Sequence, residues 1–229
     1  MRAYAIIVAA GRSERFGGAV PKQFQALCGR PLLSWTVSRF EAAASVGQIV
    51  VVVAEDHLLY TGRKVVEPYS FSKVIKIVKG GETRQESVLR GLESLPFSTR
   101  LVAIHDGARA LVSPSDIDRV VEVAATERAA MLAVPAADTV KRVRDGFIIN
   151  TLERDSLYLA QTPQVFQYDL ILAAHQEASD QFSATDDASL VEAKGFKVRF
   201  VEPERPNIKV TTKQDLFIAE ALLREENDD

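Results

Sequence analysis

A short apolar run near the start of the chain ends abruptly in a basic loop, and this junction constrains the fold more than any other segment. Residues 3–10 are mostly small or β-branched over a length that suits a fully buried strand. The apolar run stops at Gly11, and a glycine-containing loop with Arg15 and Lys22 follows. Small residues let backbone N–H groups converge on an anion, and the two cations add positive charge there. The junction therefore predicts a loop that binds polyphosphate.

Two common phosphate loops do not match this junction. A Walker loop that starts at Gly11 would need glycine at the position of Phe16. A dinucleotide-binding fingerprint would need glycine at Ser13 and again at Phe16. The pattern that remains, A-A-G-x-x-x-R-F followed by P-K, resembles the signature loop of sugar and polyol nucleotidyltransferases. The alternative is a surface turn with solvated basic residues.

The rest of the chain alternates buried strands with amphipathic helices. This alternation predicts one doubly wound α/β domain over residues 1–229, with a mostly parallel sheet. We expect strands at residues 3–10, 49–54, 74–78, 101–105, 131–135 and 197–201. We expect helices from Pro31 to Ala44, over residues 57–66, after the caps Thr83 and Ser113, and over residues 168–178, 185–194 and 212–225. Thr83 with Glu86, and Thr212 with Asp215, have the spacing of capping boxes, and Thr185 is the expected cap of its helix.

Two segments interrupt this alternation. Residues 138–152 form short alternating pieces around Asp145-Gly146, which is a hairpin signal. Such a hairpin is either an arm that packs on another subunit or a hairpin exposed to solvent, and the residues alone leave both open. Residues 154–164 include Gln161-Thr162-Pro163-Gln164 and predict a loop-rich segment.

The composition is that of an ordinary globular protein and excludes several functional classes. A net charge of −3 argues against a general nucleic-acid binder. Cys28 is the only cysteine, so no disulfide within the chain is expected and a cytoplasmic location fits. Apolar runs are shorter than a membrane span requires, so no membrane association is expected.

Three stretches point to one crevice, because Gly11, Gly81 and Asp106 all follow the ends of expected strands. Asp106 suits Mg²⁺, which commonly takes one or two protein carboxylates and completes its shell with phosphates and water. The alternative for Asp106 is a turn cap paired with Arg109. Lys209 lies between Ile208 and Val210 and has a surface lysine as its alternative. The three histidines lack the spacing of metal ligands, so no zinc site and no histidine-based catalysis are expected.

Seven motifs occur in an order and spacing that resemble the 2-C-methyl-D-erythritol 4-phosphate cytidylyltransferase family. They are AAGRSERFGGAVPKQF, GGETRQES, HDGARA, ADTVKR, TLERDSLYLAQTPQ, ATDDAS and NIKVT. The resemblance implies a Rossmann-like nucleotidyltransferase that joins CTP to methylerythritol phosphate. A phosphate oxygen of the acceptor attacks the α-phosphorus of CTP and pyrophosphate leaves. That attacking oxygen is already anionic, so a strong general base is unnecessary.

The resemblance also implies a role for each matching residue. Nucleotide binding falls to Ala9, Ala10, Gly11, Gly81, Glu82 and Ser87. The catalytic cations are Arg15, Lys22 and Lys209, and Asp106 holds Mg²⁺. The acceptor is bound by Arg109, Thr139, Arg154, Thr162 and Thr185. The family forms a homodimer with exchanged arms, so residues 137–154 would be a dimerisation arm and Thr139 and Arg154 would serve the partner's site.

The chain departs from the family pattern at several positions near the site. Glu82 stands where aspartate is common, Ala110 replaces a proline after Arg109, and Pro206 replaces an acidic residue before Asn207. One alternative is a ribitol 5-phosphate cytidylyltransferase, which shares the nucleotide half but usually lacks the pattern around Thr139 and Arg154. Another alternative is a nucleotide-binding protein without turnover. The joint presence of four charged residues argues against it, because binding alone would not require all of them: Arg15, Lys22, Asp106 and Lys209.

Overall fold

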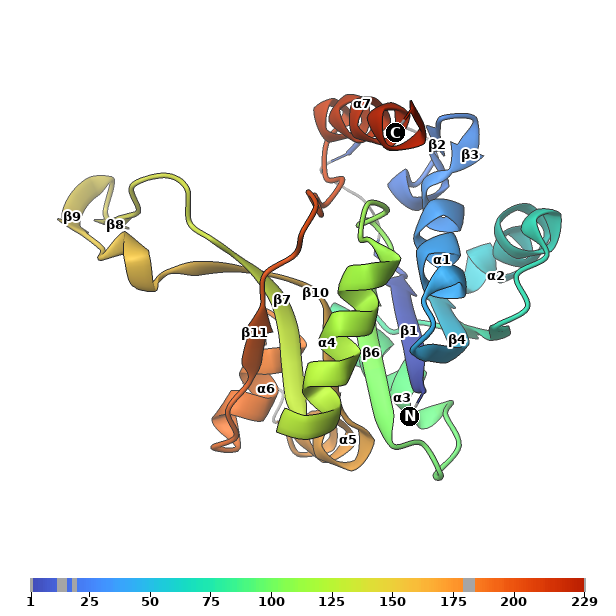
Figure 1. Cartoon of the computed structure of the whole chain (residues 1–229), viewed down its shortest axis with the longest axis horizontal. Helices are drawn as coiled ribbons and strands as arrows, with labels where there is room; N and C mark the ends of the chain where they lie inside the picture. The colour runs from blue at the N-terminus through green and yellow to red at the C-terminus, as the bar shows by residue number, and fades with distance from the viewer. Residues whose placement is uncertain (1, 12–15, 18–19, 179–183, 229) are drawn as a thin grey trace.

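A mostly parallel seven-stranded sheet forms the centre of the chain in the computed structural model, which describes residues 2–11, 16–17, 20–178 and 184–228 (Figure 1). The strand order is β11-β7-β10-β6-β1-β4-β5. The bounds are Ala3–Ala9 for β1, Val46–Val53 for β4, Val74–Lys79 for β5, Leu101–Asp106 for β6, Ala129–Pro135 for β7, Tyr158–Gln167 for β10 and Arg199–Val201 for β11. All six expected strands are present, and the predicted α/β class is confirmed.

Strand β10 corrects the expectation of a loop-rich segment at residues 154–164. It lies between β6 and β7 and is antiparallel to both. Its pairing with β7 shifts register between Ala160 and Gln164, so Pro163 sits where no ladder hydrogen bond is required. Val165 and Phe166 then carry the strand into the core. The glutamines and the proline are typical of a loop, and this segment forms a strand because it pairs with β6 and β7.

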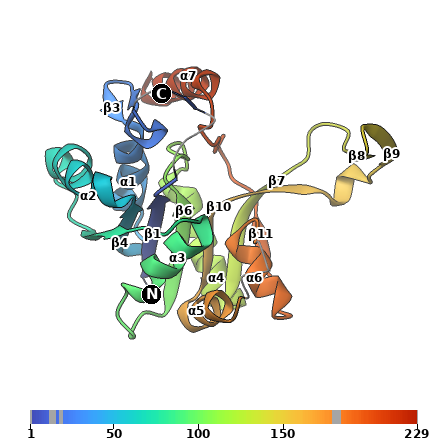
Figure 2. The same cartoon turned by 180° about the vertical axis from the view of Figure 1, so that it is seen from behind.

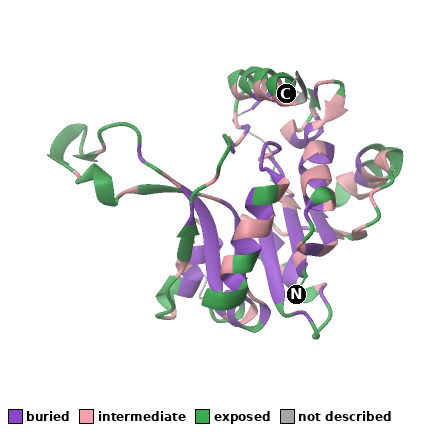
Figure 3. Ribbon diagram, viewed as in Figure 1, coloured by how far each residue is buried: buried purple, intermediate pink, exposed green. Residues whose placement is uncertain are grey.

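Helices cover both faces of the sheet (Figures 1 and 2). One face carries α1 at Leu32–Ala42 and α4 at Pro114–Glu127. The other carries α3 at Arg84–Glu93, α5 at Tyr168–Glu177 and α6 at Asp187–Ala193. Burial follows this layering, because the sheet and the inner helix faces are buried while the outer faces contact solvent (Figure 3). A doubly wound sheet places ligands at the carboxyl ends of its parallel strands.

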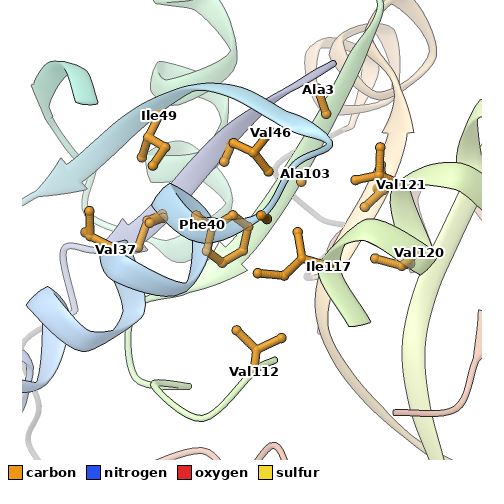
Figure 4. Packing of buried hydrophobic residues seen from close by; sticks show 14 of the residues in the cluster. Ala3, Val37, Phe40, Val46, Ile49, Ala103, Val112, Ile117, Val120 and Val121 are labelled. Carbon is orange, nitrogen blue, oxygen red and sulfur yellow. The ribbon is translucent and has the colours of Figure 1, made fainter. Parts of the chain in front are cut away.

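The core on the first face is built by regularly spaced apolar residues of α1. Leu33, Val37 and Phe40 are fully buried, and Phe40 packs near Ile117 of α4 (Figure 4). Ala44 was expected on the same helical face, which is wrong. The helix ends at Ala42 with an extended residue after it, so Ala43 is buried and Ala44 is exposed.

The helix caps are largely as expected. Thr83 and Ser113 accept hydrogen bonds from the backbone three residues later, and Thr212 and Asp215 form a reciprocal capping box at the start of α7, Lys213–Asp228. The capping box expected at Thr83 is only half formed, because the Glu86 carboxylate accepts from the N–H of Glu82. The expected cap of α6 is wrong. Asp186 rather than Thr185 accepts from the N–H of Ser189, since its short carboxylate reaches the first turn.

Short elements complete the chain. The helix expected at residues 57–66 is a series of turns over residues 55–69, with α2 at Leu58–Tyr60 between 3₁₀ turns and a π-helical stretch at Thr61–Val66. Strands β2 at Ala26–Leu27 and β3 at Arg30–Pro31 form a small ribbon. Single 3₁₀ turns lie at Lys22–Phe24 and Arg154–Ser156. Among the residues that the structure describes, no helix is long and apolar enough to cross a membrane.

The expected hairpin is present and projects from the body as an arm (Figure 1). It consists of β8 at Lys141–Arg144 and β9 at Phe147–Thr151. Asp145 and Gly146 both have positive φ, as a two-residue hairpin turn requires. Every residue of both strands is exposed, and Phe147 and Ile148 keep 75% and 66% of their surface. The arm thus exposes large apolar side chains to solvent.

Candidate active site

A cavity of about 590 Å³ opens at the carboxyl ends of β1 and β6. These strands are parallel neighbours, so their ends meet at one edge of the sheet. The expected single crevice is confirmed by its lining, which contains Ala9, Ala10, Gly11, Lys22, Gly81, Glu82, Ser87, Asp106 and Lys209. Phe16, Gln23, Thr83, Arg84 and Thr211 also line it and were not expected from the sequence.

The loop after β1 is tied to the sheet by a glutamine. The amide Nε2 of Gln23 donates to the carbonyl of Ala9 at 3.0 Å, and Gln23 itself is buried. This bond holds the 3₁₀ turn that carries Lys22 against the strand end. Lys22 therefore stands beside Gly11 on the cavity wall. Arg15, the other expected cation of this loop, lies outside the described residues.

The second wall is formed by a glycine pair that approaches β1 closely. A Cβ at Gly80 would lie 2.4 Å from Cβ of Ala10 and 2.8 Å from Oγ of Ser87, so only glycine fits there. The hydroxyl of Ser87 accepts from the N–H of Gly81 at 3.0 Å and donates to the carbonyl of Thr83. Glu86 accepts from the N–H of Glu82 and shapes the same turn. The turn is thus rigid before any ligand binds.

The carboxylate of Asp106, at the end of β6, is surrounded by basic side chains. Its Oδ2 accepts from Nζ of Lys209 at 2.6 Å, and its Oδ1 accepts from Nε of Arg84 at 3.2 Å. The Nε of Arg109 lies 3.9 Å from Oδ2. Burial opposes ionisation of this carboxyl, but Arg84 and Lys209 outweigh it and hold its pKa far below the usual range. Asp106 is therefore an anion at neutral pH.

Behind Arg84 lies a second buried carboxylate, which sequence reasoning did not assign to the site. The guanidinium Nη2 of Arg84 donates to Oδ2 of Asp187 at 2.7 Å, and Nε2 of His175 lies 3.1 Å from Oδ1 of Asp187. Burial disfavours ionisation of Asp187, but Arg84 and the His175 hydrogen bond lower its pKa. Both residues stand inside quoted motifs, GGETRQES and ATDDAS, yet no spacing in the sequence links them.

His105 is buried beneath the turn after β6 and is linked to Asp106 through Thr162. Its Nε2 lies 3.0 Å from the carbonyl of Arg109, and its Nδ1 lies 3.1 Å from Oγ1 of Thr162. The same hydroxyl of Thr162 accepts from the N–H of Asp106 at 3.0 Å. Complete burial lowers the pKa of His105 to about 4, so its imidazole stays neutral at pH 7.

Comparisons with known proteins identify the family to which the chain belongs. The sequence matches the family described as 2-C-methyl-D-erythritol 4-phosphate cytidylyltransferase over residues 3–225. The chain belongs to this family. It is 47% identical over 222 residues to the enzyme of that name from Pelotomaculum thermopropionicum, covering 96% of this chain and 93% of the relative.

Solved structures with related names share the fold along nearly the whole chain. The 4-diphosphocytidyl-2C-methyl-D-erythritol synthase of Anaerococcus prevotii superposes with a TM-score of 0.85 at 30% identity, covering 97% of this chain and 96% of that one. The 2-C-methyl-D-erythritol 4-phosphate cytidylyltransferase of Thermus thermophilus superposes with a TM-score of 0.79 at 36% identity, covering 98% and 100%. The nucleotidyltransferase class expected from the loop after β1 is therefore shown for this cytidylyltransferase-family chain.

The five residues expected on the acceptor side lie outside the lining of this cavity. Arg109 donates to the carbonyl of Asn207 at 2.7 Å, and Thr162 is buried beneath Asp106. Thr185 is exposed ahead of α6. Thr139 and Arg154 are exposed near the arm, where Arg154 donates to the carbonyl of Ala137 at 3.1 Å. None of the five lines the cavity described above.

The chemistry around Asp106 fits the divalent cation that the family resemblance implies. Among the residues that the structure describes, no three histidine, cysteine, aspartate or glutamate side chains converge on a metal position. A Mg²⁺ site needs no such cluster, because one carboxylate together with substrate phosphates and water suffices. Asp106 is ionised, faces the cavity and already attracts two cations to its oxygens.

Proposed function

We propose that this chain transfers the cytidylyl group of CTP to 2-C-methyl-D-erythritol 4-phosphate and releases pyrophosphate. One observation carries the proposal. Lys22 and Lys209, from opposite ends of the chain, line the same cavity as the glycine loop and the carboxylate of Asp106. That combination matches a substrate that carries a triphosphate and a divalent cation. A cavity of about 590 Å³ lies within the range of small-molecule sites.

The nucleotide is bound at the two walls that meet above β1. The backbone at Ala9, Ala10 and Gly11 approaches the phosphates, where Lys22 and Arg15 contribute positive charge. The rigid turn made by Gly81, Glu82 and Ser87 reads the cytosine edge by hydrogen bonds. Because internal hydrogen bonds hold this turn in one shape, a base whose donors and acceptors do not match it would be bound less tightly.

The reaction needs positioning and charge neutralisation rather than a base. The acceptor phosphate is anionic before it attacks the α-phosphorus, and His105 is neutral and buried. Lys22 and Lys209 stabilise charge that develops on the α-phosphate and on the leaving pyrophosphate. Asp106 would hold Mg²⁺, which when bound neutralises phosphate charge. Arg109, Thr162 and Thr185 hold or support the acceptor side.

The chain functions as a single domain, residues 1–229, in a homodimer whose arms are exchanged. Residues 137–154 form the dimerisation arm. Supporting this, Phe147 and Ile148 are exposed on a two-stranded hairpin, which is marginally stable in water unless another surface covers it. In the dimer, Thr139 and Arg154 serve the acceptor pocket of the second copy, where the planar fork of Arg154 suits a phosphate.

Pyrophosphate release tests this function directly. The protein is incubated with Mg²⁺ and either CTP or UTP, together with methylerythritol phosphate or ribitol 5-phosphate as acceptor. We expect rapid release only with CTP and methylerythritol phosphate. Faster release with ribitol 5-phosphate would reassign the acceptor, and no release with any pair would identify a nucleotide-binding protein without turnover.

A further inference from the structure

Four charged side chains of alternating sign form a continuous row from the core to the cavity. Asp187 at the start of α6 bonds Arg84 at the start of α3, Arg84 bonds Asp106 at the end of β6, and Asp106 bonds Lys209. The distances are 2.7, 3.2 and 2.6 Å. Only the Asp106 and Lys209 end of the row has a role in the reaction proposed above.

Arg84 is fixed in orientation because its guanidinium spans two carboxylates. Nη2 points back to Asp187, whose side chain is 1% exposed, and Nε points to Asp106 at the cavity. A planar guanidinium that is held at both positions cannot rotate without losing one of them. Arg84 is therefore placed to hold Oδ1 of Asp106, while Lys209 contacts Oδ2.

Asp187 is itself held from the far side by α5. The side chain of His175 is completely buried, and its Nε2 lies 3.1 Å from Oδ1 of Asp187. An ionised carboxylate only accepts hydrogen bonds, so Nε2 carries the proton. Among the residues that the structure describes, Nδ1 of His175 has no hydrogen-bond partner, so Nε2 is the ring nitrogen that contacts Asp187. With one oxygen on His175 and one on Arg84, Asp187 has no freedom to turn.

We propose that Arg84 is a positioning residue that orients the carboxylate of Asp106, and that Asp187, held by His175, keeps Arg84 in place. This inference rests on the proposed function, since it assigns Asp106 to the divalent cation. The inference explains why the ion pair between Arg84 and Asp187 lies beneath the cavity. Two apolar side chains at these positions would cost less free energy to remove from water. The side chains involved come from α3, α5, α6 and β6, so the row joins the nucleotide wall to the segment that follows Thr185.

The test uses Mn²⁺ as the probe ion and two independent measurements. Mn²⁺ binding in the presence of CTP is followed by the electron paramagnetic resonance of free Mn²⁺, and pyrophosphate release gives kcat and KM. For Asp187→Asn we expect Mn²⁺ affinity and kcat to fall by roughly 10–100-fold, as for partners behind a metal ligand. KM for CTP should stay within about threefold, because Arg84 acts through Asp106. Arg84→Lys should behave like Asp187→Asn, since a single ammonium cannot span both carboxylates.

A double-variant cycle and a matched control separate positioning from general destabilisation. If Asp187 acts through Arg84, the Arg84→Ala and Asp187→Asn double variant should be no worse than Arg84→Ala alone. Asp118→Asn, which removes a hydrogen-bonded carboxylate beside Ser45 at the amino end of β4, should leave both measurements unchanged. Thermal unfolding reports whether each variant folds. If Asp187→Asn does not fold, Arg84→Lys, on the cavity wall, still gives the Mn²⁺ affinity and kcat that test the proposal.

The two proposals fail in different ways. Wild-type protein that binds no Mn²⁺ with CTP, or releases no pyrophosphate, would overturn the proposed function and this inference with it. Wild-type activity together with unchanged Mn²⁺ affinity in both Asp187→Asn and Arg84→Lys would overturn the positioning role alone. Fully additive losses in the double variant would likewise show that Asp187 does not act through Arg84.

Discussion

Nζ of Lys209 lies 2.6 Å from Oδ2 of Asp106, although the two residues are 103 positions apart. A backbone hydrogen bond brings the two segments together, because the N–H of Val210 donates to the carbonyl of Ala108 at 2.9 Å. Val210, Ala108 and Leu223 of α7 share a buried apolar cluster at this edge of the sheet. The last segment of the chain is thus fastened to the turn after β6, and the site is complete only when both are folded.

Lys22 should contribute to the transition state more than to substrate binding. In Lys22→Ala we expect kcat to fall on the order of 10²–10³-fold, as when a donor that stabilises developing charge is removed. The measurement is steady-state pyrophosphate release with CTP and methylerythritol phosphate. An increase in KM with unchanged kcat would instead make Lys22 a ground-state ligand.

Nucleotide choice should follow from the turn between Gly81 and Ser87. Internal hydrogen bonds at Gly81 and Ser87 hold the turn in one shape, so we expect a base whose donors and acceptors do not match that shape to be rejected. We expect kcat/KM for CTP to exceed that for UTP, ATP and GTP, measured with one acceptor at fixed Mg²⁺. Comparable turnover with UTP would remove this turn from base recognition.

The glycine at position 80 is required by close packing, and its replacement should be costly. In Gly80→Ala the new Cβ would lie 2.4 Å from Cβ of Ala10, which has no flexible side chain to move. Overpacking of this kind costs about 1–3 kcal/mol, and it would also displace the nucleotide wall. We expect a lower Tm and a higher KM for CTP. Gly62→Ala is the control, because its Cβ would meet only ordinary contacts at 3.8 Å and should leave both values near wild type.

The position of the site was predictable because strand ends are visible in the sequence. Gly11, Gly81 and Asp106 each follow an apolar run, and parallel strands bring such ends together. The same logic cannot find residues that contribute through burial. Arg84 and Asp187 stand in polar motifs at helix starts, where a charged residue is ordinarily a cap or a solvated side chain. Only the packing of α5 and α6 turns Asp187 into a buried partner of Arg84.

Strand β10 shows a second limit of sequence reasoning. Residues Gln161 to Gln164 have a composition typical of turns. They belong to a strand because β10 pairs with β6 on one side and with β7 on the other. Propensity is a weak guide where tertiary pairing decides the structure. The arm was recognisable from Asp145-Gly146, but the partner surface proposed for its exposed side chains belongs to a second copy and leaves no pattern within one chain.

The stability contributed by Asp187 should depend on pH in a defined direction. Burial opposes its ionisation, but Arg84 and His175, which face it from α3 and α5, lower its pKa in the folded state. A depressed pKa gives stability that is full above the unfolded value, about 3.9 for aspartate, and is lost as pH falls through the folded value. The Tm difference between wild type and Asp187→Asn should therefore be largest near about pH 7 and shrink below about pH 4. A constant difference from neutral to acid pH would show that the charge of Asp187 is not what stabilises the fold.

The proposed exchange of arms makes a prediction about mixed dimers. If Arg154 acts in the partner's site, an Arg154→Ala chain and a Lys22→Ala chain are each nearly inactive alone but complement each other. A mixed dimer then has one site with Lys22 from the first chain and Arg154 from the second, and one site that lacks both. The experiment mixes the two variants under conditions that allow subunit exchange and follows pyrophosphate release over time.

The recovered activity has a definite expected size. Random exchange makes about half of the dimers mixed, and each of these has one intact site out of two, so activity should return to roughly a quarter of wild type. Each variant incubated alone through the same exchange step is the control and should stay inactive. Exchange itself is measured with differently tagged chains. If tagged chains form mixed dimers and activity does not return, Arg154 belongs to the site of its own chain, and the exposed edge at Phe147 and Ile148 has a purpose other than sharing the active site.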